Sequence, residues 1–91
     1  MPRLLTTKSY DRQLIKFKRK HPELREHYTK TLRLLEVNPQ HPSLRLHKLK
    51  GKLQTYSSVS INLKYRIMID FIIKDDVIIL ISIGSHTEQG M

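Results

Sequence analysis

The spacing of the apolar residues changes from a helical to a strand-like period near residue 55. Before that point, Tyr10, Leu14 and Phe17 recur at helical intervals, which predicts an amphipathic helix over residues 8–20. A second stripe predicts another helix, which starts at a proline because proline is tolerated in a first helical turn. The residues of this second stripe are Leu24, Tyr28, Leu32, Leu34 and Leu35, and the pair Asn38-Pro39 ends it.

Beyond residue 55, apolar and polar residues alternate, which is the period of a β-strand. Two alternating runs, 58–63 and 65–73, predict two strands, and a turn at 74–76 separates them from a third. The third strand is the nearly unbroken apolar run 77–83, whose composition places it inside the sheet. Helices followed by consecutive strands indicate the α+β class, with two N-terminal helices packed on a small antiparallel β-sheet.

The whole chain, residues 1–91, is expected to form one domain, because no linker, repeat or low-complexity tract divides it. Residues 3–7 are expected to add a short first strand, and residues 38–53 to form a loop, since they hold two prolines and a glycine. A chain of this length buries only a small core. The side chains expected in that core are Leu14, Phe17, Leu32, Leu35, Val59, Ile61, Ile67, Ile69, Ile79 and Ile81.

The chain has a formal net charge of +9 and an isoelectric point of about 10.1. No acidic residue occurs between Val37 and Ile69. The basic residues and histidines of this window are Arg45, Lys48, Lys50, Lys52, Lys64, Arg66, His41 and His47. Because such an excess attracts polyanions, an RNA or DNA backbone is the first expected partner and an acidic protein is the second.

Cysteine is absent, which excludes a disulfide framework and a thiolate metal site and is compatible with a reducing cytoplasm. No apolar run reaches the length of a membrane span, and the N-terminus lacks the long apolar segment of a signal peptide. A membrane surface ranks third among the partners, because the basic loop lacks an amphipathic helix with bulky apolar anchors. We therefore expect a cytoplasmic protein with no membrane partner.

Arg66 is the informative residue of the strand region, because a charged side chain in an apolar strand is costly unless it faces water or a ligand. His47 precedes the sheet, and His86 follows Gly84, where the last strand ends. If the strands are neighbours, these two histidines and Arg66 converge on one open face. The residues expected to hold RNA around this face are Lys50, Lys52 and Lys64, with Tyr56 and Tyr65 as stacking candidates.

Two imidazoles and a guanidinium suit the metal-free cleavage of RNA. That reaction needs a base for the proton of a 2′-hydroxyl, an acid for the departing 5′ oxygen, and a fixed cation for the charge that develops at phosphorus. Histidine titrates near neutral pH. Arginine stays charged, and its planar guanidinium group binds phosphate through two parallel hydrogen bonds. A metal nuclease needs clustered carboxylates, which the basic window lacks, so we expect no metal and no cofactor. Each histidine taken singly is nevertheless more often structural or solvated, and His21, His27 and His41 receive no catalytic role.

The stretch HKLKGKLQTYSSVSINLKYRIMID, followed by VIILISIGSH, resembles the RelE/ParE superfamily of bacterial type II toxins. The likeness is to its YafQ- and YoeB-like branch of mRNA endonucleases, and it covers nearly the whole chain. Two helices precede the motif LKG, a short strand, the YRI strand and a last strand that ends in Gly-x-His. The resemblance implies a RelE-like fold, cleavage of mRNA in the ribosomal A site, and neutralisation by a cognate antitoxin.

The resemblance also implies roles for single residues. His47 matches the position where such toxins place a general base, Arg66 the phosphate-stabilising arginine, and His86 the near-C-terminal general acid. Lys50 and Lys52 resemble lysines that bind the RNA backbone.

The chain departs from the family pattern at two places. Where YafQ-like members have a histidine and an aspartate in the sheet, this chain has Ser60 and Lys64, which brings it closer to the YoeB-like set. It also ends in HTEQGM, without the aromatic residue that many relatives have there, so Tyr56 or Tyr65 is the candidate for stacking on a base.

Two other functions stay open at this point. A ParE-like inhibitor of DNA gyrase would share the fold, but it would not need two histidines and an arginine together. A non-catalytic nucleic-acid-binding module would agree with the basic first helix, but neither a recognition helix nor a repeated aromatic signature accompanies that helix. We prefer the ribosome-dependent mRNA endonuclease.

Overall fold

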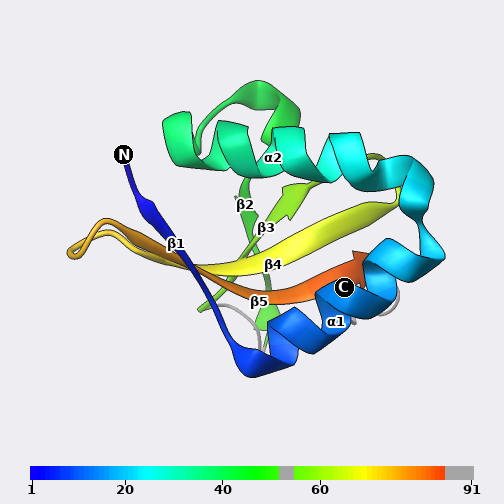
Figure 1. Cartoon of the computed structure of the whole chain (residues 1–91). Coiled ribbons are helices and arrows are strands. Elements are labelled where there is room, and N and C mark those ends of the chain that lie inside the picture. Colours follow the sequence, from blue (N-terminus) through cyan, green and yellow to red (C-terminus); the bar gives the residue numbers. More distant parts are fainter. Residues whose placement is uncertain (52–54, 86–91) are drawn as a thin grey trace.

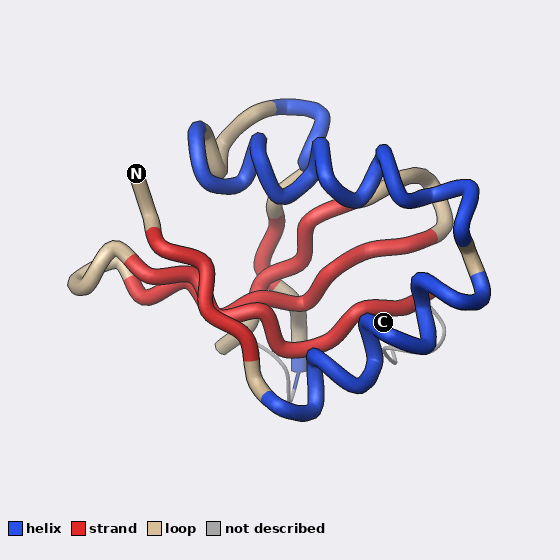
Figure 2. Tube along the Cα trace, viewed as in Figure 1, coloured by secondary structure: helices blue, strands red, loops and turns tan. Residues whose placement is uncertain are grey.

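The structure is a computed structural model, and it describes residues 1–51 and 55–85; residues 52–54 and 86–91 lie outside the description. Along the described chain, a strand is followed by two helices and then by further strands (Figure 1 and Figure 2). The helices are α1 (Lys8–Lys20) and α2 (Arg25–Val37), and short 3₁₀ turns cover Pro22–Leu24 and Pro42–Leu44. The strands are β1 (Arg3–Thr6), β2 (His47–Lys48), β3 (Ser57–Ser60), β4 (Tyr65–Ile72) and β5 (Val77–Ser85).

The strands of the described residues form one sheet in the order β1-β5-β4-β3-β2. Neighbouring strands are antiparallel except β1 and β5, which run parallel. The expected α+β class, the first strand and the helix over residues 8–20 are confirmed. β5 has a neighbour on each side, as its apolar composition predicted. In the described part of the chain, no helix is long and apolar enough to cross a membrane.

The expected loop over residues 38–53 is wrong at one place. His47–Lys48 forms β2, which pairs with Ser57 and Ser58 of β3 and makes one edge of the sheet. Two residues are too few to show a period in the sequence, so only the neighbouring strand defines this element.

The strand expected over residues 58–63 ends early, because β3 stops at Ser60. The side-chain oxygen of Asn62 accepts hydrogen bonds from the backbone N–H groups two and three residues further on, at 3.0 and 2.8 Å. Such a turn around asparagine offers the backbone an alternative to the strand ladder. Leu63 therefore lies in the turn before β4, with 83% of its surface exposed.

The core lies between both helices and a single face of the sheet. Tyr10 and Phe17 reach it from α1, and Tyr28 and Leu35 from α2. The expected core residues that are buried are Phe17, Leu35, Val59, Ile61, Ile67 and Ile69, and Leu14 and Leu32 are half-buried against them. The helical and strand periods therefore predicted most of this core.

The expected burial of Ile79 and Ile81 is wrong, since both are only half-buried. Along β5, Ser82 lies opposite Met68, but Leu80 lies opposite the next residue of β4, so Ile81 is one extra residue in the ladder. This β-bulge shifts the alternation of β5. The buried core residues of this strand are Ile78, Leu80 and Ile83. An unbroken apolar run shows no alternation, so its sequence could not reveal the shift.

A hydrogen bond between two buried tyrosines joins the helices. The hydroxyl oxygens of Tyr10 in α1 and Tyr28 in α2 lie 2.8 Å apart. Burial raises the pKa of both hydroxyls above the ordinary value of 10.0, and for Tyr10 the nearby Tyr28 adds to the rise. The folded protein therefore holds these two protons more tightly than the unfolded chain does.

This pair predicts a loss of stability at alkaline pH. Below about pH 10 both states keep the tyrosine protons, and above it the unfolded chain releases its protons first. The free energy of unfolding should then fall by about 1.4 kcal/mol per pH unit for each of the two tyrosines. Urea unfolding measured from about pH 9 to about pH 11 tests this.

The Tyr10→Phe variant removes one titrating group of the pair, so it should lose less stability over the same pH range. Tyr56→Phe is the matched control, since it removes a hydroxyl outside the core. An alkaline loss in Tyr10→Phe equal to that of the wild type would contradict this account.

Candidate functional site

The sheet register places His47 and Arg66 on the same face. His47 pairs with Ser58, and Ser58 pairs with Met68, so these three side chains share a face across β2, β3 and β4. Arg66 lies two residues before Met68 and therefore has the same orientation. This face is opposite the one that carries the core residues Ile67 and Ile69. His47 and Arg66 are separated by two strand spacings across the sheet and by two residues along β4. These offsets put their Cα atoms roughly 12 Å apart.

Arg66 occupies an interior position of the sheet. On β4 it pairs with Ser60 of β3 on one side and with Gly84 of β5 on the other. Small neighbours on both sides leave room for a large guanidinium group, and the Arg66 side chain is half-buried. Arginine stays protonated in proteins, so this position keeps a fixed positive charge on the face.

His47 is held in one tautomer by the backbone. Its Nδ1 lies 2.9 Å from the carbonyl oxygen of Arg45. A carbonyl oxygen only accepts, so Nδ1 must carry the proton, and Nε2 of the neutral ring is left with a lone pair. Arg45 itself has a left-handed backbone (φ 49°), which turns the chain just before β2. An exposed imidazole with an unprotonated Nε2 is suited to take a proton from a substrate.

The other predicted RNA contacts lie in different places. Lys50 is exposed two residues after the end of β2, and Lys64 is exposed in the turn between β3 and β4. Tyr56 has the orientation of Ser58 by strand alternation, which puts it on the face of Arg66. Tyr65 is on the opposite, helix-covered face, so the structure does not bring it together with Arg66.

Two predicted site residues, Lys52 and His86, lie outside the described residues. β5 is described up to Ser85, which directly precedes His86 in the sequence. The roles of Lys52 and His86 stay predictions.

The face that carries Arg66 was expected to be open, and it is only partly so. Ser58 is 1% exposed and Met68 is 9% exposed. The backbone N–H of Leu49 donates to the carbonyl of Tyr56 at 3.0 Å, which extends the β2–β3 ladder and leaves Leu49 buried. The Ser58 hydroxyl has no hydrogen-bond partner among the described residues. His47, at the edge strand, is the exposed part of this face.

The sequence matches no protein-family model, and no curated protein is significantly similar to it. Solved structures match the fold over nearly its whole length. YafQ from E. coli has a TM-score of 0.80 at 12% identity and covers 100% of both chains. A metal-bound toxin from Helicobacter pylori has a TM-score of 0.79 at 22% identity, with 97% of this chain and 98% of that chain covered. A YoeB/ParE toxin from Agrobacterium tumefaciens has a TM-score of 0.76 at 19% identity, with 92% and 98% covered.

The chain has the fold of the RelE/ParE toxins. YafQ also matches as a component of the E. coli DinJ–YafQ toxin–antitoxin complex, with a TM-score of 0.78 at 14% identity and coverage of 99% of this chain and 98% of that one. The resemblance stated from the sequence motifs is thereby supported at the level of the fold. Within the described residues of this RelE/ParE fold, no group of three His, Asp or Glu side chains is placed to hold a metal ion.

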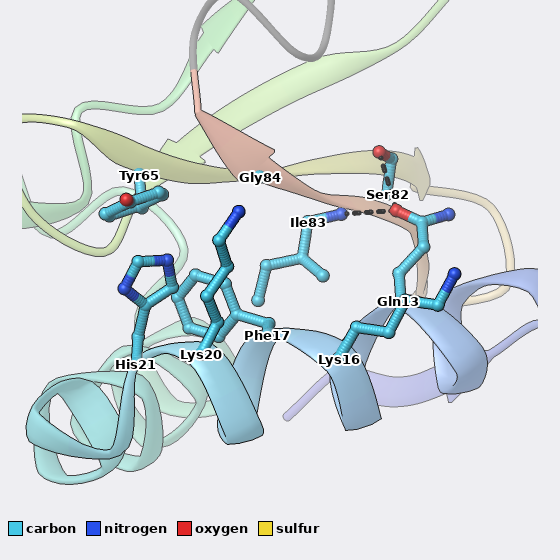
Figure 3. A pocket seen from close by; sticks show the side chains of 9 residues that line it. All are labelled: Gln13, Lys16, Phe17, Lys20, His21, Tyr65, Ser82, Ile83 and Gly84. Atoms are coloured by element: carbon cyan, nitrogen blue, oxygen red, sulfur yellow. Dashed lines mark hydrogen bonds between the residues drawn. The ribbon is translucent and has the colours of Figure 1, made fainter.

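The RelE/ParE fold of this chain also holds a cavity that the motifs did not indicate. It has a volume of about 320 Å³ and lies between α1 and the end of β5, on the helix side of the sheet (Figure 3). We call it the α1–β5 pocket, and its lining residues are Gln13, Lys16, Phe17, Lys20, His21, Tyr65, Ser82, Ile83 and Gly84. The one signal in the sequence was the row of basic residues on α1, which also fits an ordinary solvated helix face.

The tautomer of His47 can be measured directly. Nitrogen-15 NMR of the imidazole rings near neutral pH should show His47 with a protonated Nδ1, because that atom faces the carbonyl of Arg45. His41 is the internal control, because its Nδ1 accepts the backbone N–H of Ser43 at 3.2 Å and should be unprotonated. The same tautomer in both rings would contradict the geometry of His47.

Proposed function

We propose that this chain is the toxin of a type II toxin–antitoxin system, and that it cleaves mRNA on the ribosome by acid–base catalysis. The observation that carries the proposal is the shared sheet face of Arg66 and His47, with Arg66 in the sheet interior and His47 in a base-competent tautomer. Two further facts support it: the solved structures with this fold are toxins, and the charge of +9 suits an RNA-rich target.

In the proposed reaction, His47 Nε2 takes the proton of a ribose 2′-hydroxyl. The 2′ oxygen attacks the adjacent phosphorus, and the bond from phosphorus to the 5′ oxygen breaks. The products are a 2′,3′-cyclic phosphate and a 5′-hydroxyl, which receives its proton from the acid that we assign to His86. Arg66 stabilises the charge that grows on the phosphoryl oxygens. Every step uses groups of the chain, so the mechanism needs neither a metal nor a cofactor.

Substrate binding is assigned to the basic residues around the same face. Lys50 and Lys64 are exposed and carry no ion pair among the described residues, so both are accessible to phosphates. Lys52 is proposed to act with them. Tyr56, on the face of Arg66, is the better stacking candidate, because the ring of Tyr65 packs against Phe17 and His21 on the other side of the sheet.

The proposed partner in the resting state is an acidic antitoxin. Neighbours of the same fold were solved in toxin–antitoxin complexes, DinJ–YafQ from E. coli and YoeB–YefM from Staphylococcus aureus. A positively charged toxin attracts an acidic, partly disordered segment that folds on contact.

The partner proposal predicts salt-sensitive binding of the product of the neighbouring gene. Surface plasmon resonance should show tight association whose rate constant falls as the ionic strength rises, because charge complementarity acts mainly on the association rate. A neighbouring product that is basic, or an acidic one that does not bind, would contradict this partner.

The catalytic proposal predicts a graded series of variants. Arg66→Ala should slow cleavage by about two to three decades, because it removes a fixed charge that meets the transition state. His47→Ala and His86→Ala should each cost on the order of 10²–10⁴-fold. Lys50→Ala should mainly weaken binding, and more so at higher salt. Single-turnover cleavage of mRNA on programmed ribosomes measures all of these.

His27→Ala is the control of this series, since His27 is an exposed residue of α2, on the helix side of the sheet. Circular dichroism establishes that each variant is folded. Cleavage at the wild-type rate by folded Arg66→Ala and His86→Ala would overturn the residue assignment. A wild type that halts growth without cutting mRNA would instead favour inhibition of DNA gyrase.

A further inference from the structure

The α1–β5 pocket combines an apolar floor with basic side chains at its mouth. Phe17 and Ile83 form the floor, and both belong to the buried core. Lys16 and Lys20 extend from α1 across the opening, one helical turn apart (Figure 3). None of the lining residues is acidic. An anion with a flat apolar part fits both features, because the ring would contact the floor and the charge would meet the lysines.

The sides of the pocket are fixed by contacts within the protein. On one side, His21 and Tyr65 lie with ring centroids 4.5 Å apart, and the Phe17 ring meets Tyr65 edge-on at 5.4 Å. On the other side, the Gln13 side-chain oxygen accepts hydrogen bonds from the Ser82 hydroxyl and the Ile83 N–H, both at 3.0 Å. These contacts hold the cavity between α1 and β5 in a defined shape.

The two lysines belong to a longer row of like charge on α1. Lys8, Arg12, Lys16 and Lys20 follow one another at intervals of four residues, and all are exposed. Like charges at this spacing destabilise a helix by a few tenths of a kcal/mol per pair. Lys20 in the last turn is favoured by the helix dipole, but Lys8 in the first turn is not. No ion pair among the described residues offsets the charge of Lys16 or Lys20.

We propose that the α1–β5 pocket binds one unpaired RNA nucleotide, with its base against Phe17 and Ile83 and its phosphate between Lys16 and Lys20. Sites for single-stranded nucleic acid usually combine basic residues that bind the phosphate backbone with aromatic side chains that contact the bases. The volume of about 320 Å³ is at the lower end of small-molecule pockets and suits one nucleotide. The Tyr65 side chain that lines this site points to the opposite face of β4 from Arg66, and Gly84, the partner of Arg66 on β5, also lines it. The inference adds a second RNA contact and does not rest on cleavage.

The test is binding of a fluorescent, unstructured oligoribonucleotide of about eight residues to the full chain, without ribosomes. The double variant Lys16→Gln/Lys20→Gln should bind about tenfold or more weakly and should reduce the slope of log affinity against log salt by about 1.4. Lys18→Gln/Arg19→Gln is the matched control, because it removes the same charge from the same helix at two exposed residues that belong neither to the row nor to the lining of the pocket. Its affinity should change by no more than about twofold.

Two further probes test the role of the base. In NMR spectra, the oligoribonucleotide should shift the Ile83 methyl and His21 ring signals, whereas inorganic polyphosphate should not. If both double variants weakened RNA binding equally, or if polyphosphate shifted the same NMR signals as RNA, the pocket would be a general anion-binding surface. Either result would overturn the proposal. Tighter binding of an acidic peptide than of RNA, with the same dependence on Lys16 and Lys20, would overturn it in favour of a protein partner. Because no cleavage is measured, failure of this proposal and failure of the nuclease proposal are distinguishable.

Discussion

The arrangement of this molecule depends on one constraint: both helices bury their apolar stripes against the same face of the sheet. The Tyr10–Tyr28 hydrogen bond ties the helices together above that face. The opposite face is only partly buried, at residues such as Ser58 and Met68, so its remaining positions can hold a charged residue that a fully buried face would exclude. Arg66 occupies such a position, between Ser60 and Gly84. The chemistry that we propose for the chain depends on the part of this face that stays accessible.

The sequence predicted the parts of the fold that have a period. The helical stripe through Tyr10 and Phe17 and the alternation through Ile67 and Ile69 are both present in the structure. Features without a period were missed or misplaced. The two-residue strand β2 is defined by its partner β3, the early end of β3 by the side chain of Asn62, and the shifted face of β5 by one bulged residue. Each of these depends on local hydrogen bonding that apolar spacing does not encode.

The candidate site shows the same division. His47 and Arg66 were expected to converge on one face if the strands were neighbours, and the register puts both residues on the same face. The tautomer of His47 is set by the carbonyl oxygen of Arg45, a residue with a left-handed backbone. The residue pattern did not predict this backbone conformation. The orientation of Tyr65 toward the helices follows from its position next to Arg66, because neighbouring strand residues point to opposite faces. Tyr65 and Arg66 were predicted to belong to one RNA-binding site. In the structure they lie on opposite faces of the sheet, and both faces carry basic residues.

We propose that Arg66 is essential for mRNA cleavage by this chain. The most direct measurement maps mRNA 5′ ends in cells after induced expression of the wild type and of Arg66→Ala at equal protein levels. We expect new ends inside translated codons with the wild type, and none of these ends with folded Arg66→Ala. The same ends in both, or intact mRNA with DNA damage in cells that express the wild type, would contradict it.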